Sequence, residues 1–216
     1  MAVVTVIVGD LIESRTKASR KELSRQLPLH IADVHRDYRE EFVAPLVLTR
    51  GIDELSGVLK RPFMSYTICE LLNERLYPSA FRFAVVTGIL DVGVGSKDAR
   101  KMDGPAFHKA ADLMEQAKRD RLRYVFSVSG KKVASADPVL TELANLIQTI
   151  RERQSDRQRY LIKLYEELNN QSDVAKELGV TQQTVSDALR AAQWRELRRS
   201  KDAIVAFLKS CEPTRQ

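Results

Sequence analysis

A chain of 216 residues with 44% hydrophobic and 30% charged residues can bury one sizeable core or two modest ones, and we expect two domains. A net charge of +6 and a pI of 9.4 suit a polyanionic partner, although so mild an excess also occurs in proteins that bind none. The opening MAVVTVIVGDLIESR is too short an apolar run to span a bilayer and lacks the basic start of a signal peptide. We therefore expect a cytoplasmic protein without a membrane partner.

The two cysteines, Cys69 and Cys211, lie in patterns typical of apolar helix faces and have no metal-ligand spacing. We expect both to be free thiols in a reducing cytoplasm. The sequence also contains no Walker-type glycine loop, no Cys-His cluster and no G-x-S-x-G motif. P-loop, zinc and serine-hydrolase chemistry therefore have no support.

The first predicted element is a strand from Val3 to Val8, a β-branched run without alternation that favours a central position covered on both faces. It ends at Gly9-Asp10. A long helix follows over about residues 18–40. Its predicted core face carries apolar residues at steps of three and four: Leu23, Leu27, Ile31 and Val34.

Two strands come next, at residues 45–50 and 55–59, so that Gly51-Ile52-Asp53-Glu54 forms the tip of a hairpin. A second helix is predicted over 62–76 and a fourth strand over 81–87. The order β-α-β-β-α-β predicts an α+β, ferredoxin-like fold, with both helices on one sheet face and the first and third strands central. The predicted inner face of the second helix consists of Tyr66, Cys69, Leu72 and Leu76.

A loop over 91–103 leads to an amphipathic helix over 104–118, whose inner face we predict to carry Phe107, Ala111 and Met114. A last strand follows at 123–128. These elements make a first domain of residues 1–136, a connecting helix lies in 137–154, and an all-α domain fills 155–216. The connecting helix has an apolar side formed by Leu140, Leu143, Leu146, Ile147 and Ile150.

The C-terminal domain contains a predicted helix, tight turn and helix at 171–190, QSDVAKELGVTQQTVSDALR. Asn170 and Thr181 can cap the two helices, and Gly179 suits the left-handed residue that ends the first. A preceding helix capped by Ser155 supports the pair. The spacing of small, glycine and β-branched residues predicts a DNA-binding helix-turn-helix, and an ordinary helical hairpin is the alternative. The predicted buried residues are Val174, Ala175, Leu178, Val185, Ala188 and Leu189.

Double-stranded DNA is the partner that this motif predicts, and a homodimer on two half-sites is the usual arrangement. The exposed face of the second helix would read bases, because the amide of Gln matches the edge of adenine. The basic stretch from Arg190 to Lys201, opposed only by Glu196, would contact phosphates. The candidate DNA-binding residues are Thr181, Gln182, Gln183, Thr184, Ser186, Asp187, Arg190, Arg195, Arg198 and Arg199.

Carboxylates mark a second candidate site in the first domain. Asp10 ends the first strand, and Asp53 and Glu54 lie at the hairpin tip, which is adjacent in a ferredoxin-like sheet. Asp10 and Asp53 could share a Mg²⁺ ion, which favours carboxylate oxygens and phosphate. The alternative is that Asp10 caps a turn and that the hairpin acids are solvated.

The stretches VGDLIESR, LTRGIDELSGVL and MDGPAFHKAADLMEQAK resemble the three landmark stretches of the SatD family over about residues 1–130. The resemblance implies a palm-type domain like that of nucleotide cyclases, with Asp10 as the first-strand acid and Asp53 as the hairpin acid. It adds Gly104, Pro105 and His108 to the site, with a partly buried structural role as the alternative for His108. The sequence departs from the family where Ile52 separates Gly51 from Asp53, and binding without turnover is therefore expected.

These observations predict a DNA-binding transcriptional regulator with a nucleotide-sensing domain. Its predicted ligand-binding residues are Asp10, Asp53, Glu54, Gly104 and His108. The alternative is a Mg²⁺-dependent nucleotidyl-transferring, cyclase-like enzyme that uses Asp10 and Asp53 and is targeted to DNA by the helix-turn-helix. A protein-interaction module without DNA is the third reading. The operator, the ligand and the activating or repressing sense stay open.

Overall fold

The computed structural model describes residues 2–12, 17–129 and 136–211. The chain divides into two compact units, the sheet unit (Met1–Glu142 with Ile204–Gln216) and the helical unit (Leu143–Ala203). Helices α4 (Ala136–Glu152) and α8 (Trp194–Ser210) each contribute to both units. The end of α8 thus groups with the first part of the chain, which the spacing of its apolar residues did not indicate.

The sheet unit is built on five described strands: β1 (Ala2–Ile12), β2 (Phe42–Arg50), β3 (Glu54–Leu59), β4 (Ala80–Leu90) and β5 (Tyr124–Ser127). Their order is β2-β3-β1-β4-β5, and all neighbours are antiparallel except β4 and β5. The β-branched run of β1 is buried on both faces, through Val4 and Val6 on one and Ile7 on the other. The prediction of a covered strand is confirmed.

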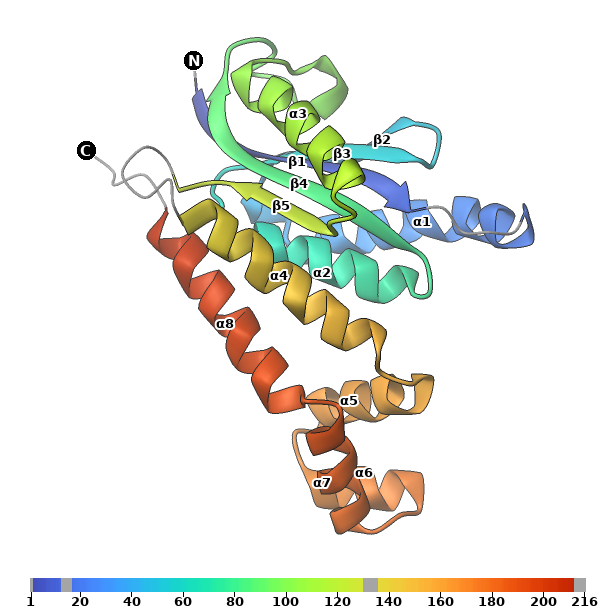
Figure 1. Cartoon of the computed structure of the whole chain (residues 1–216). Coiled ribbons are helices and arrows are strands. Elements are labelled where there is room, and N and C mark those ends of the chain that lie inside the picture. Colours follow the sequence, from blue (N-terminus) through green and yellow to red (C-terminus); the bar gives the residue numbers. More distant parts are fainter. Residues whose placement is uncertain (1, 13–16, 130–135, 212–216) are drawn as a thin grey trace. The chain divides into compact units, whose positions relative to one another are not determined.

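Helices cover both faces of this sheet: α1 (Lys17–Asp37) and α2 (Ser65–Leu76) lie on one face and α3 (Pro105–Arg119) on the other (Figure 1). Short 3₁₀ helices, η1 (Arg39–Glu41) and η2 (Ala99–Lys101), precede β2 and α3. Every residue predicted for the inner faces of α1 and α2 is buried. The aromatic ring of Tyr66 on α2 meets Tyr124 of β5 edge-on at 5.3 Å between centroids.

Helix α3 packs through a face rotated by one residue from the predicted one. Met114 is buried as expected, but Ala111 is exposed and Ala110 takes its place. The helix approaches the sheet through small residues, because a Cβ added at Gly88 of β4 would lie 3.2 Å from the Cβ of Ala106. Close approach of the backbone, rather than the large Phe107, therefore decides which side faces inward.

The helical unit contains α5 (Asp156–Leu168), α6 (Gln171–Leu178) and α7 (Gln182–Ala191) besides its parts of α4 and α8. Its core is formed by buried apolar residues from α5, α6 and α7. On α4, the sequence predicts Leu146 on the apolar side of the helix, but this residue is 57% exposed. Within the described residues, no helix has both the length and the apolar character needed to cross a bilayer. The core residues of α5 to α7 are Leu161, Val174, Ala175, Val185 and Leu189.

Both cysteines are free, as expected, with Cys69 buried in α2 and Cys211 half-buried after α8. Burial raises the pKa of the Cys69 thiol well above its ordinary value of 9.0. Neither thiol therefore has the low pKa of a reactive cysteine.

Candidate nucleic-acid interface

Local hydrogen bonds set the ends of α6 and α7 where the sequence predicts them. The side-chain oxygen of Asn170 accepts the backbone N–H groups of Ser172 at 2.8 Å and Asp173 at 3.3 Å. Gly179 ends α6 with a φ of 63°, and the hydroxyl of Thr181 accepts the N–H of Thr184 at 3.1 Å. The predicted caps are confirmed, and they leave a turn of residues 179–181 between the two helices.

The crossing of α6 and α7 depends on one small and one β-branched residue. Ala175 and Val185 are both buried, and Leu161 of α5 belongs to the same apolar cluster. A side chain larger than alanine at position 175 would hold the helices apart, since this cluster is closely packed. With Val185 and Leu189 facing inward, the opposite face of α7 is left for contact with a partner.

The outward face of α7 carries polar side chains that are already joined to one another. The Gln183 amide donates to the carboxylate of Asp187 at 3.0 Å, and Arg190 donates to the same oxygen at 2.6 Å. On the flank, Ser172 of α6 donates to the side-chain oxygen of Gln182 at 3.3 Å. Because these bonds hold the side chains in a few orientations, less conformational entropy is lost when a ligand replaces them.

The remaining candidate DNA-binding residues fall into two groups. Arg195 and Arg199 are exposed and lie one turn apart at the start of α8. Arg198, by contrast, lies over the ring of Trp194 at 5.6 Å and lines a cavity. Thr184 is exposed and shares a hydrogen bond with Thr181 at 2.8 Å, whereas Ser186 is half-buried. Exposed amides beside exposed guanidinium groups can donate to base edges and to phosphates.

The structure does not bring Asp10 and Asp53 together. The Asp10 carboxylate contacts Arg82 of β4 at 3.3 Å and Lys118 of α3 at 3.1 Å. The carboxylate of Asp53 instead forms a salt bridge of 2.6 Å with Arg20 of α1. Since α1 and α3 cover opposite faces of the sheet, the carboxylates of Asp10 and Asp53 lie on opposite faces as well.

Strand register explains this separation. Asp10 of β1 lies directly opposite Glu54 of β3, so those two side chains share the α3 face, and Asp53 precedes Glu54 by one residue. The backbone carbonyl of Asp53 still accepts the N–H of Leu11 at 2.7 Å. Glu54 has its own cation, Arg50, at 3.6 Å. Among the described residues no group of three or more His, Cys, Asp or Glu side chains is placed to hold a metal ion.

The Asp10 carboxylate influences the pKa values of the two cations that it contacts, Lys118 and Arg82. Burial lowers the pKa of Lys118, but hydrogen bonds to Asp10 and Glu115 outweigh it and leave that pKa raised. Burial also lowers the pKa of Arg82, against the opposing effect of Asp10. Neither partner is apparent from the sequence, because Arg82 lies opposite Asp10 only through the β1–β4 register and Lys118 lies far along the chain.

Gly104 and His108 lie at the other end of α3. Gly104 precedes the helix with a φ of 149°, and a Cβ there would come within 2.7 Å of the Asp91 carboxylate, so close packing already explains the glycine. His108 is mostly exposed and contacts Asp103 at 3.1 Å. Between His108 and Lys118 the helix rises about 15 Å. The five predicted ligand-binding residues therefore do not form one site.

Comparisons with known proteins bear on the whole chain. A family model described as SatD family matches residues 4–208, which extends through the helical unit and beyond the residues 1–130 that carry the sequence resemblance. The crystal structure of a regulator of polyketide synthase expression from Bifidobacterium adolescentis is similar at 13% identity, over 96% of this chain and 86% of that chain. Its TM-score of 0.27 is too low to relate the two folds. No curated protein matches the chain.

Proposed function

This chain belongs to the SatD family, and from that premise we propose that it is a DNA-binding transcriptional regulator whose helical unit contacts double-stranded DNA. The observation that carries the proposal is the outward face of α7. There, Gln183, Asp187 and Arg190 form one hydrogen-bonded row on the face opposite the buried residues. An amide that can reach a base edge and a guanidinium that can reach a phosphate, on one exposed helix face, suit a helix placed in the major groove.

We further propose that α6, the turn 179–181 and α7 are a helix-turn-helix, with α7 as the recognition helix. Support comes from the three-residue turn, the left-handed Gly179 and the buried Ala175 and Val185 at the crossing. Exposed Arg195 and Arg199, which follow α7 closely in the chain, would add phosphate contacts. A homodimer on symmetric half-sites in the cytoplasm belongs to the same proposal.

For the sheet unit we propose a ferredoxin-like fold extended by one strand. The connectivity from β1 to β4 with α1 and α2 on one face, and the order β2-β3-β1-β4, support it. The parallel strand β5 and α3 are the additions. A nucleotide is the ligand that the family resemblance implies for this unit, but the scattered positions of the five predicted residues give that ligand no support.

The alternative of Mg²⁺-dependent nucleotidyl transfer is weakened by the same geometry. Such chemistry needs two carboxylates on one cation, whereas Asp10 and Asp53 each contact a basic side chain of a different helix. The row that Asp10 shares is completed by Glu54 and Arg82, one acid and one base. We therefore favour the regulator over the enzyme.

The proposal is tested with the full-length protein on genomic fragments, from which bound DNA is selected and sequenced. On the selected site, Gln183→Ala should lower affinity by about 1–3 kcal/mol and on random DNA by much less, whereas Arg190→Ala should weaken both alike. Lys163→Ala, a substitution of an exposed residue on α5, is the matched control and should change neither.

Salt dependence gives a second measurement on the same samples. If Arg190, Arg195 and Arg199 each neutralise one phosphate, the slope of log affinity against log salt should be about −2.7 per subunit. Affinity that is flat in salt would exclude these phosphate contacts, and equal losses on selected and random DNA for Gln183→Ala would exclude α7 as the reading surface.

A further inference from the structure

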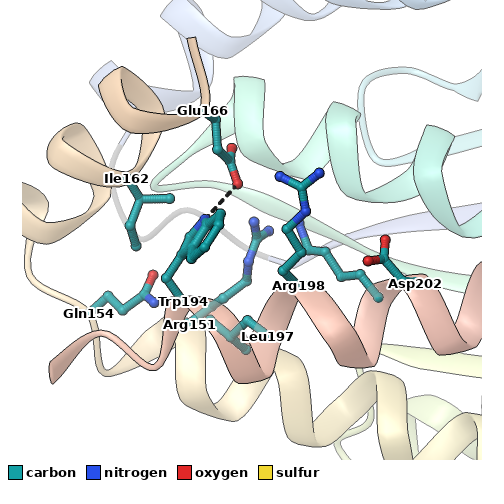
Figure 2. Close-up of a pocket in the computed structure, with 9 residues that line it drawn as sticks. Arg151, Gln154, Ile162, Glu166, Trp194, Leu197, Arg198 and Asp202 are labelled. Carbon is teal, nitrogen blue, oxygen red and sulfur yellow. Dashed lines mark hydrogen bonds between the residues drawn. The ribbon is translucent and has the colours of Figure 1, made fainter. Parts of the chain in front are cut away.

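A cavity of about 220 Å³ lies within the helical unit, away from the outward row of α7. The end of α4, one face of α5 and the start of α8 supply its walls. Trp194 is central among the side chains drawn, with Ile162 on α5 and Leu197 on α8 as apolar neighbours (Figure 2). The cavity thus offers an aromatic surface that the proposed DNA contacts do not use.

Basic side chains outnumber acidic ones around this cavity. Arg151, Arg198 and Lys201 line it, against the two carboxylates of Glu166 and Asp202. Glu166 is partly engaged, because it accepts the indole N–H of Trp194 at 3.2 Å. The surplus of positive charge in a partly enclosed space favours an anionic ligand.

The size of the cavity limits the ligand to one ring. An apolar cavity of about 150 Å³ holds benzene, whereas drug-sized ligands occupy pockets of about 300–1,000 Å³. At about 220 Å³ the cavity is large enough for a single ring with a small charged substituent. A nucleoside triphosphate is too large for it.

The cavity is joined to the C-terminal end of α7. Gln154, one of its lining residues, donates from its side-chain amide to the backbone carbonyl of Ala192 at 2.7 Å, and Ala192 is the residue that ends α7. Gln193 then turns the chain with a φ of 54°, and Trp194 begins α8. The Trp194 ring also meets Tyr165 of α5 edge-on at 4.8 Å. A ligand that contacts Gln154 and Trp194 therefore touches the residue that bonds to the end of α7 and the residue that begins α8.

We propose that this cavity is an effector site for single-ring aromatic carboxylates and that its occupant changes the affinity of α7 for DNA. The carboxylate lies among Arg151, Arg198 and Lys201, and the ring lies against Trp194. The effect on DNA rests on the proposed function, whereas binding of the ligand does not.

Binding is measured on the full-length protein with benzoate and with benzamide, its neutral analogue of the same shape. Trp194 is the only tryptophan of the chain, so its fluorescence reports on the cavity directly, and calorimetry checks the stoichiometry. Benzoate should saturate and should bind at least about tenfold more tightly than benzamide, the difference expected for charge-assisted hydrogen bonds. Arg198→Gln and Arg151→Gln should each remove this preference, whereas Arg153→Gln, an exposed neighbour outside the cavity, should keep it.

Three results with the wild-type protein and one with a variant would overturn the assignment of this site. These are equal binding of benzoate and benzamide, no saturable response to benzoate, or inorganic phosphate binding as tightly as benzoate, which would make the cavity a phosphate subsite without a role for the ring. Loss of the preference in Arg153→Gln as well would show that only general charge matters.

The regulatory half is tested by measuring DNA affinity with and without saturating benzoate, where a change of about fivefold or more is expected. Unchanged affinity in a protein that binds both would refute the coupling. Selective benzoate binding in a protein that binds no DNA would refute the proposed function and leave the site standing. DNA binding without benzoate binding would refute the ligand site and leave the proposed function standing.

Discussion

The sheet unit and the helical unit place their polar side chains differently. Two residues before the end of β1, the side chain of Asp10 is only 19% exposed and lies between Arg82 and Lys118. On α7, the row of Gln183, Asp187 and Arg190 makes its hydrogen bonds on the surface. Charge inside a fold is satisfied by the fold itself, whereas charge on an exposed helix face can exchange its partners for a ligand. Acids at strand ends are therefore weaker evidence of a site here than amides on an outward helix face.

The largest losses of unfolding free energy are expected from substitutions in the cores of the two units. These substitutions also test whether the sheet unit and the helical unit unfold independently. Phe83→Ala should cost about 3–5 kcal/mol of the free energy of unfolding and Leu189→Ala about 2–5, because both side chains are buried. Hydrogen exchange resolved by peptide should show Phe83→Ala lowering protection across the strands of the sheet unit but not in α5, α6 or α7. Leu189→Ala should lower protection in α5, α6 and α7 but not in the strands, and loss of protection in both units from either variant would show one cooperative unit.

The two acids of the sheet unit should differ in their contribution to stability. Asp10→Asn removes a charge that lies between a mostly buried guanidinium, Arg82, and a half-buried ammonium, Lys118, and should cost about 1.5–3 kcal/mol. Asp53→Asn removes a pair whose side chains are 50% and 46% exposed and should cost less than about 1 kcal/mol. Urea unfolding of both variants measures the difference. Equal losses of unfolding free energy would contradict this difference. Stabilisation of the wild type by Mg²⁺ that both variants lose would instead show that Asp10 and Asp53 bind one metal ion.

The sheet unit should lose stability at alkaline pH through its buried thiol and phenol. Burial raises the pKa of Cys69 well above 9.0 and that of Tyr124 well above 10.0, so both stay protonated in the folded chain where the unfolded chain ionises. Their contribution is complete below the ordinary pKa values and declines as pH rises above them, by about 1.4 kcal/mol per pH unit for each proton.

Cys69→Ala should flatten that decline between pH 9 and 10, as measured by urea unfolding under reducing conditions. Tyr124→Phe should flatten it above pH 10, and its loss of the 2.8 Å hydrogen bond to Glu70 gives a separate, pH-independent cost. A decline with the same slope in wild type and both variants would place the titrating groups elsewhere.

The smallest effect on stability is expected on the outward face of α7. Asp187→Ala removes an exposed pair and should change the free energy of unfolding by less than about 0.5 kcal/mol. It also frees Gln183 and Arg190 and removes a negative charge from the proposed DNA surface, so affinity for random DNA should rise. Fluorescence anisotropy with labelled DNA measures this, and a lower affinity would mean that Asp187 positions its neighbours for binding.

The features that sequence reasoning predicted correctly depend on residues a few positions apart. Asn170, Gly179 and Thr181 set helix ends through hydrogen bonds and backbone angles of their own turn, and Ser155 does the same for α5 through a capping box. The inner face of α1 likewise follows from apolar residues at helical spacing, which a core of any shape would bury.

The features that it missed depend on how distant segments meet. Whether Asp53 or Glu54 shares the face of Asp10 is decided by the register of β1 against β3, and a change of one residue reverses the answer. The inner side of α3 is decided by how closely the helix can approach Gly88, which favours Ala110 over Ala111. The cation that each acid contacts, Arg20 or Lys118, is decided by which helix covers that face of the sheet. Helix caps and helix faces depend on residues a few positions apart, so the sequence alone predicts them. Strand register and helix packing depend on contacts across the whole unit, so only the tertiary structure shows that Asp10 and Asp53 lie on different faces of the sheet.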